Sequence, residues 1–131
     1  MSSKDPAHSH TFIIAAAAIG TIFIGFGLNG MLRPEQALSF FGFDPPALLQ
    51  DKKVVNALVV VESARDVFMG LAIYAASYHG HRKALGWIVI AAGLVAFVDG
   101  AVCLATVGQG HWVHWGYAPV VTIIGALGIL D

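Results

Sequence analysis

Four ionisable side chains lie inside long apolar stretches of the sequence, where charged residues are rare. Glu62, Arg65 and Asp66 fall near the middle of one stretch, and Asp99 falls inside the next. On a helix, residues three and four apart share a face, so the first three side chains project within about 100° of one another. A charge at the centre of a membrane is costly and is usually functional. Carboxyl groups held beside a guanidinium are typical of acid/base chemistry.

The charges of this cluster do not balance. Its three carboxyl groups carry −3 when they are ionised, and Arg65 carries +1. A buried excess of negative charge is not tolerable in a low dielectric. Either further cations join, from Arg33 or from a charged His111 or His114, or one or two carboxyl groups stay protonated at neutral pH. The alternative to a functional site is a buried polar network that only fixes the register of the helices.

Polar residues near the ends of the apolar stretches are candidates for binding a substrate. Asn29 and Arg33 lie four residues apart at the end of the first stretch, and His111 and His114 lie three apart in the aromatic connection GQGHWVHWGYAP. The histidine spacing would permit a metal or haem ligand role, but no carboxylate or cysteine accompanies them there, so we expect no metal. The alternatives are a helix–helix hydrogen bond for Asn29 and an interfacial role for the histidines. Cys103 is expected to be inert packing.

The composition identifies the environment of these residues. The chain has 131 residues, of which 57% are hydrophobic and 11% are charged, whereas a soluble domain has about 25% charged residues. So few charges could not cover the surface of a soluble fold, and nucleic-acid binding would need a basic patch. A single cysteine excludes an internal disulfide framework. We therefore expect an integral membrane protein with one transmembrane domain over residues 1–131.

Four apolar stretches are long enough to cross a membrane as helices, which takes roughly 20 residues. They cover about 11–32, 54–76, 84–107 and 112–130. Because backbone groups in lipid must be hydrogen-bonded internally, we expect an all-α four-helix bundle with both chain ends on one side. The long first loop is apolar and aromatic from Ala37 to Phe43, which favours a short interfacial helix. Basic residues lie equally on both sides, so they do not orient the protein.

The second and third stretches are joined by a short turn, so the depths of their charged residues can be compared. At about 1.5 Å per residue from Gly80, Glu62 lies roughly 27 Å along one helix and Asp99 roughly 28 Å along the other. Arg65 and Asp66 lie roughly 21 to 23 Å along the first of these helices. We therefore expect the four side chains to meet, nearer the side that carries the long loop and the histidines.

Several short motifs resemble those of a known group of proteins. They are GLNGMLRPEQALSFFGF at the end of the first stretch, ESARDVFMGLAIYAA in the second and FVDG in the third. Over about residues 11–130 the chain resembles the small fungal integral membrane proteins grouped as a domain of unknown function in the DoxX-like four-helix superfamily. The resemblance implies a multi-pass four-helix membrane bundle and no settled activity. It also implies fungal secondary metabolism, a polyketide- or terpenoid-like substrate and, for a fungal protein, the endoplasmic reticulum.

A second likeness is chemical rather than sequential. The cluster resembles the Asp–Arg–Asp site of limonene-type epoxide hydrolases, in which one carboxyl group protonates the epoxide oxygen, the other activates water, and arginine holds both. Those soluble enzymes contain a curved sheet, so this likeness implies nothing about the fold. It implies Asp66 or Glu62, with Arg65 and Asp99, in these roles.

The first functional hypothesis is a membrane-embedded acid/base enzyme that acts on a lipophilic small molecule. It would open an epoxide, as a hydrolase or cyclase, or isomerise a double bond. Asp99 or Glu62 would be the acid, Asp66 the base and Arg65 the orienting cation. We expect no cofactor; the partners would be the substrate and membrane lipid, and a homodimer is left open. The alternatives are a proton-coupled carrier and a non-catalytic accessory subunit with a structural polar network.

Overall fold

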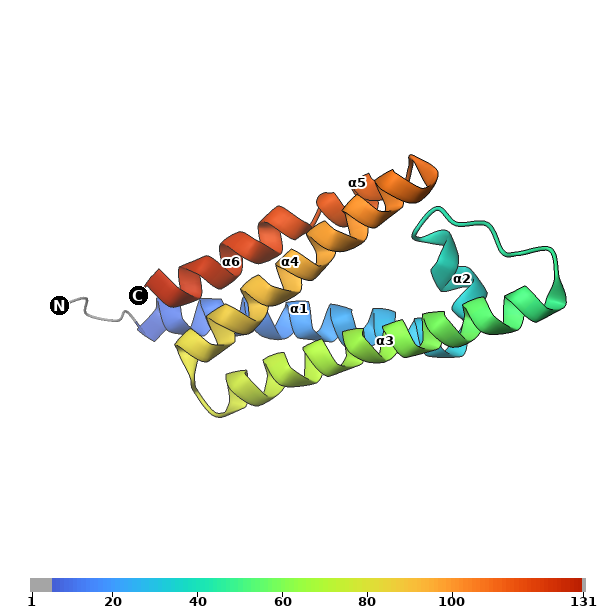
Figure 1. The fold of residues 1–131 in the computed structure, drawn as a ribbon. Coiled ribbons are helices and arrows are strands. Elements are labelled where there is room, and N and C mark those ends of the chain that lie inside the picture. Colours follow the sequence, from blue (N-terminus) through green and yellow to red (C-terminus); the bar gives the residue numbers. More distant parts are fainter. Residues whose placement is uncertain (1–5, 131) are drawn as a thin grey trace.

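The computed structural model describes residues 6–130, which form helices joined by short turns and one longer loop (Figure 1). In chain order the helices are α1 (Pro6–Leu32), α2 (Pro34–Ser39), α3 (Leu49–Tyr78), α4 (Arg82–Val107), α5 (His111–Trp115) and α6 (Ala118–Leu130). The start of α1, the end of α6 and the turn between α3 and α4 lie at one end of the molecule, and α2 and α5 lie toward the other (Figure 1). The described part of the chain is therefore all-helical.

Three helical segments are long and apolar enough to cross a membrane. They are His10–Leu32, Arg82–Val107 and His111–Leu130, which correspond to three of the four expected spans. The remaining stretch lies in α3, which is longer than any of them but carries Glu62, Arg65 and Asp66 at its middle. These charges lower its hydropathy. The three apolar segments are consistent with a membrane protein.

The first loop differs from the prediction in the position of its short helix. The helix begins at Pro34, whose fixed φ suits the first helical position, and it ends at Ser39 instead of continuing to Phe43. The aromatic residues that follow form a turn, because Gly42 adopts a φ of +74°, a conformation that glycine tolerates and a helix does not. The expected short helix is thus confirmed, but it ends four residues before Phe43.

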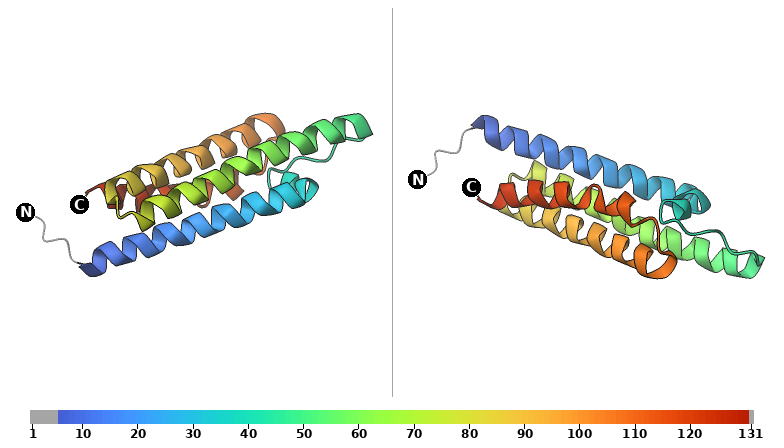
Figure 2. Two further views of the ribbon diagram at one scale, coloured as in Figure 1. Left: turned by 90° about the horizontal axis from the view of Figure 1, so that it is seen from below. Right: turned by 90° about the horizontal axis from the view of Figure 1, so that it is seen from above.

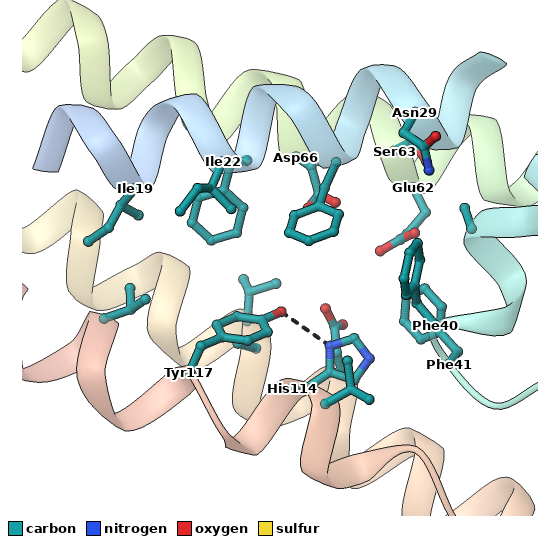
Figure 3. Close-up of a pocket in the computed structure, with 18 residues that line it drawn as sticks. Ile19, Ile22, Asn29, Phe40, Phe41, Glu62, Ser63, Asp66, His114 and Tyr117 are labelled. Atoms are coloured by element: carbon teal, nitrogen blue, oxygen red, sulfur yellow. Dashed lines mark hydrogen bonds between the residues drawn. The ribbon is translucent and has the colours of Figure 1, made fainter. Parts of the chain in front are cut away.

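The last apolar stretch is not one continuous helix. Residues 111–115 form α5 and residues 118–130 form α6, with a turn between them. Pro119 has no backbone N–H and cannot donate to the preceding turn of a helix. The break places His114 and Tyr117 on a bend, where both side chains turn toward the middle of the molecule (Figure 3).

The four longest helices pack most extensively as two pairs, α1 with α3 and α4 with α6. Glycines form both contacts. A Cβ atom at Gly27 would lie 2.7 Å from the carbonyl oxygen of Ser63, and one at Gly86 would lie 2.8 Å from that of Gly125. Small residues let helices approach this closely in a membrane. The long helices run side by side in both further views (Figure 2).

The space between the two pairs is filled with apolar side chains toward the α3–α4 turn. These core residues are Phe12, Ala16, Ile19, Phe23, Met69, Ile73, Leu85, Val89, Ala92 and Val121. Arg82 closes this end of the molecule, since its guanidinium lies 5.0 Å from the centre of the Phe12 ring and its Nε donates to the carbonyl oxygen of Gly128 at 3.2 Å. The packed core thus fixes the two pairs at one end and leaves the other end to the charged residues.

Candidate functional site

The structure brings together the four charged residues of α3 and α4, here called the charged cluster: Glu62, Arg65, Asp66 and Asp99. Arg65 Nη2 donates to Glu62 Oε1 at 2.5 Å and to Asp99 Oδ2 at 3.0 Å, and Arg65 Nη1 donates to Asp99 Oδ1 at 3.5 Å. Asp66 Oδ1 lies 3.6 Å from Arg65 Nη2. The prediction that these four side chains lie close together, made from helical spacing and depth, is therefore confirmed.

The guanidinium is shared unequally among the three carboxyl groups. Asp99 uses both oxygens to accept from Arg65, and Glu62 uses one. Asp66 contacts Arg65 through the longer ion pair, beyond the usual length of a hydrogen bond. All three carboxyl side chains are largely shielded, with exposed fractions of 31% for Glu62, 20% for Asp66 and 16% for Asp99. Asp66 is thus the carboxyl group with the least compensation for its charge.

A cavity of about 420 Å³ lies between the two helix pairs beside the charged cluster. This volume is typical of a small-molecule site, for which the usual range is roughly 300 to 1,000 Å³. Apolar side chains make up most of its wall, and its polar lining is Asn29, Glu62, Ser63, Asp66, Asp99, His114 and Tyr117. Glu62 and Asp66 reach into the cavity from α3, opposite His114 and Tyr117 (Figure 3). The arrangement resembles a ligand pocket, apolar with a few convergent polar groups.

His114 is the most deeply buried polar group of this cavity wall besides Ser63, with 5% of its surface exposed. Its Nδ1 lies 3.2 Å from the hydroxyl of Tyr117, and its ring lies 4.9 Å from that of Phe41. Its Nε2 is buried and has no hydrogen-bond partner among the described residues. A buried ring nitrogen without a partner is costly, so a polar group of a ligand in the cavity would stabilise it.

Gly100 and Trp115 set the position of α5 on α4. Trp115 Nε1 donates to the carbonyl oxygen of Phe97 at 3.0 Å, and a Cβ atom at Gly100 would collide with the indole ring. The glycine that follows Asp99 therefore provides the space in which the indole packs. Since Trp115 follows His114 directly, this contact also determines where His114 lies relative to Asp99.

Two connecting segments meet at the end of the cavity away from the packed core. Phe40 and Phe41 line it from the turn after α2. Gly110, with a φ of +86°, lies so close that an added Cβ atom would come within 2.7 Å of the carbonyl oxygen of Phe41. Only glycine tolerates this conformation and this approach. The connection before α5 therefore rests directly on the turn after α2.

Two of the residues expected to bind a substrate lie away from the cavity. Arg33 is exposed at the start of α2 and does not line the cavity, because α1 ends there and the chain turns outward. His111 packs between Trp112 and Trp115, with ring-centre distances of 5.0 and 5.2 Å, and is also absent from the cavity wall. The structure therefore does not bring Arg33 or His111 to the wall of this cavity, and a role for either in ligand binding stays a prediction.

The remaining expected residues, and some unexpected ones, lie on the cavity wall. Asn29 is half-buried there, and His114 is buried. Sequence reasoning missed Tyr117 and Ser63. The spacing of three between His114 and Tyr117 could have indicated the first, and nothing in the sequence indicated the second.

Cys103 is fully buried and lies outside the cavity wall. Within residues 6–130, no group of three or more His, Cys, Asp or Glu residues could hold a metal ion.

Comparison with known proteins gives one match. The profile of a family described as a domain of unknown function (DUF4267) matches residues 20–128, which include every residue of the charged cluster. No curated protein sequence and no solved structure matches the chain. Because the match covers most of the sequence, the chain belongs to the DUF4267 family.

Proposed function

We propose that the protein is a membrane-embedded acid/base enzyme that opens an epoxide in a lipophilic, polyketide- or terpenoid-like molecule. One observation carries the proposal: a single guanidinium is shared unequally among three carboxyl groups at the wall of a mainly apolar cavity. Unequal environments separate an acid from a base among like groups. The same groups could isomerise a double bond.

The proposal includes α3 as a fourth membrane span. This helix packs along α1 over much of its length, and its three charged residues face the other helices and the cavity instead of lipid. Charges inside a membrane protein are tolerated when they face the interior and pair with one another. A multi-pass four-helix bundle would fit the resemblance to DoxX-like proteins, and a fungal member would reside in the endoplasmic reticulum.

Asp66 is the proposed general acid. With Arg65 donating to Glu62 and Asp99, the pairing favours ionised carboxylates at those two positions. An ionised Asp66 would be repelled by both of them, and a proton on Asp66 removes that part of the repulsion. This assignment reverses the expectation from the sequence, in which Asp66 was the base, because spacing alone could not reveal which carboxyl groups the guanidinium contacts.

Glu62 is the proposed general base. It accepts from Arg65 through Oε1 only, so its second oxygen is available to a water molecule or a substrate hydroxyl. Asp99 uses both oxygens on Arg65 and is a positioning residue that holds the guanidinium between the helices.

The proposed reaction needs no other reactant than water. Asp66 gives its proton to the epoxide oxygen while the carbon–oxygen bond breaks. Water forms a new bond to the carbon, and Glu62 takes the proton that water releases. Passage of that proton from Glu62 to Asp66 restores the starting state. A hydroxyl group of the same molecule in place of water would give a cyclic ether. Asn29 and His114 Nε2 are the groups proposed to bind the substrate oxygen.

The test is turnover of a panel of lipophilic epoxides by the purified protein in detergent, with Asp66→Asn and Glu62→Gln. Both substitutions keep the side-chain shape and remove one proton-transfer group, so we expect kcat to fall about 10²- to 10⁴-fold in each. The wild type should give a bell-shaped dependence of kcat/KM on pH. Asp66→Asn should flatten its alkaline limb, and Glu62→Gln its acidic limb. Asp51→Asn, exposed on the same helix, is the matched control.

Other outcomes identify the alternatives. Unchanged turnover in the folded Asp66→Asn variant would refute the assignment. Proton flux in liposomes that disappears in Asp66→Asn, without any product, would indicate a carrier. Loss of stability in both variants, without product or flux in the wild type, would indicate a structural network.

A further inference from the structure

A second cavity lies against the charged cluster, distinct from the first. It has a volume of about 720 Å³ and is lined from the loop after α2, the first half of α3 and the last part of α4. Three residues line both cavities: Phe41, Glu62 and Asp99. The two cavities therefore adjoin at two carboxyl groups and one aromatic ring.

The second cavity is mainly apolar away from this boundary. Its wall consists mainly of aliphatic and aromatic side chains, such as Val55, Leu58 and Val102, and Asp44 is its one other charged residue. Each cavity by itself has a volume in the range of small-molecule sites, roughly 300 to 1,000 Å³. The two carboxyl groups that both cavities share thus lie between two mainly apolar hollows.

We propose that the two cavities form one site for an elongated, uncharged lipophile that carries its oxygen function near the middle of its length. The oxygen lies at the charged cluster, within the first cavity beside this boundary, and hydrocarbon extends from there into both cavities. This inference rests on the proposed function only in placing the reacting oxygen at the carboxyl groups.

The charge of the cluster determines which ligands are rejected. Three carboxyl groups face one guanidinium, so a ligand carboxylate or phosphate at the boundary would meet uncompensated negative charge. Fatty acids and phospholipid headgroups are therefore poor ligands there. An epoxide, alcohol or ether oxygen adds no charge and can accept a proton or a hydrogen bond.

Phe41 lies at the boundary between the two cavities. Its ring stacks on Phe43 at 6.0 Å and contacts His114 at 4.9 Å. The residue after it is Gly42, whose positive φ turns the chain at this point. The ring therefore lies between aromatic neighbours from both sides of the boundary. A bound chain would pass this ring beside the carboxyl groups.

The experiment is photo-crosslinking in nanodiscs with a long-chain secondary alcohol that has a mid-chain hydroxyl and a diazirine at one or the other end. Labelled peptides are mapped by mass spectrometry. We expect labels around Ile22 or Val121 in the first cavity and around Val55 or Val102 in the second. Val102→Trp, which fills the second cavity, should lose the labels there, whereas Leu94→Trp, exposed on the same helix outside both cavities, should keep them.

Labels confined to one cavity, or no specific labels, would overturn the inference. So would displacement of the probe by a long-chain carboxylate as readily as by an unlabelled mid-chain alcohol, because the ligand would then not be selected for lack of negative charge. Labelling requires no turnover, so Asp66→Asn should retain it. Labels in both cavities without any turnover would refute the proposed function alone, and turnover with labels in one cavity would refute this inference alone.

Discussion

The two ends of the space between the helix pairs are built from the same helices but in different ways. Near the α3–α4 turn, side chains such as Ile73 and Val89 are fully buried and belong to the packed core. Toward α2 and α5, the same helices enclose the charged cluster and two cavities. The larger apolar core thus lies toward one end, and the buried carboxyl groups lie toward the other.

The difference between the two ends shows how a small helical protein can hold an open site. Lipid is as apolar as the interior of the protein, so helix association depends on close packing instead of the hydrophobic effect. The glycine contacts within each pair and the packed core between them supply this contact. The polar end can then remain open, because carboxyl groups cannot be packed against apolar side chains without partners. Changes at each end should therefore have separable effects.

The largest effect is expected for Arg65→Gln, which removes the cation of the cluster. Three carboxyl groups would then face one another, and we expect a loss on the order of 3 kcal/mol in the free energy of unfolding. This value is at the low end for a buried ion pair, because 35% of the Arg65 side chain is exposed. Unfolding in detergent with increasing denaturant measures the free energy of unfolding. Arg33→Gln, exposed and outside the cavity, should change stability by less than about 0.5 kcal/mol. Equal effects of both substitutions would contradict the role of the cluster.

Gly27→Leu should have the next largest effect, because it separates α1 from α3. The added Cβ atom would come within 2.7 Å of the Ser63 carbonyl oxygen, which cannot move without shifting the helix. We expect a loss of about 2 to 3 kcal/mol. Gly25→Leu is the matched control, since a Cβ atom there meets nothing within 4 Å. If both variants unfold at the same denaturant concentration, the close approach of α1 and α3 does not stabilise the fold.

Ile73→Ala and Ile22→Ala compare the two ends directly. Ile73 is fully buried in the packed core, whereas Ile22 is 56% exposed and lines the first cavity. We expect Ile73→Ala to lose about 2 kcal/mol, at the low end for this substitution because lipid offers similar apolar contacts to the unfolded helices. Ile22→Ala should leave stability nearly unchanged and alter the KM of a substrate. A larger destabilisation by Ile22→Ala would refute the division between the two ends.

The sequence predicted the helices and the meeting of the charged residues, because both follow from periodicity and from counting along a hairpin. Glu62, Arg65 and Asp99 meet for this reason. The sequence could not predict that Arg33 turns away from the cavity. A single residue after α1 decides the direction of the chain there. The contact between Trp115 and Gly100 was equally inaccessible, because it depends on how a broken helix folds back onto α4.

The smallest effect is expected for Trp115→Phe, which keeps the aromatic volume and removes the hydrogen bond to Phe97. We expect a loss of about 1 kcal/mol in stability, the usual value for one such bond. Because this bond fixes α5, His114 should also shift relative to Asp99, which the NMR signals of the His114 ring would report. Trp112→Phe, at a residue that is 72% exposed, should leave those signals in place. If Trp115→Phe lowers stability without moving the His114 signals, Trp115 stabilises the fold but does not position the site.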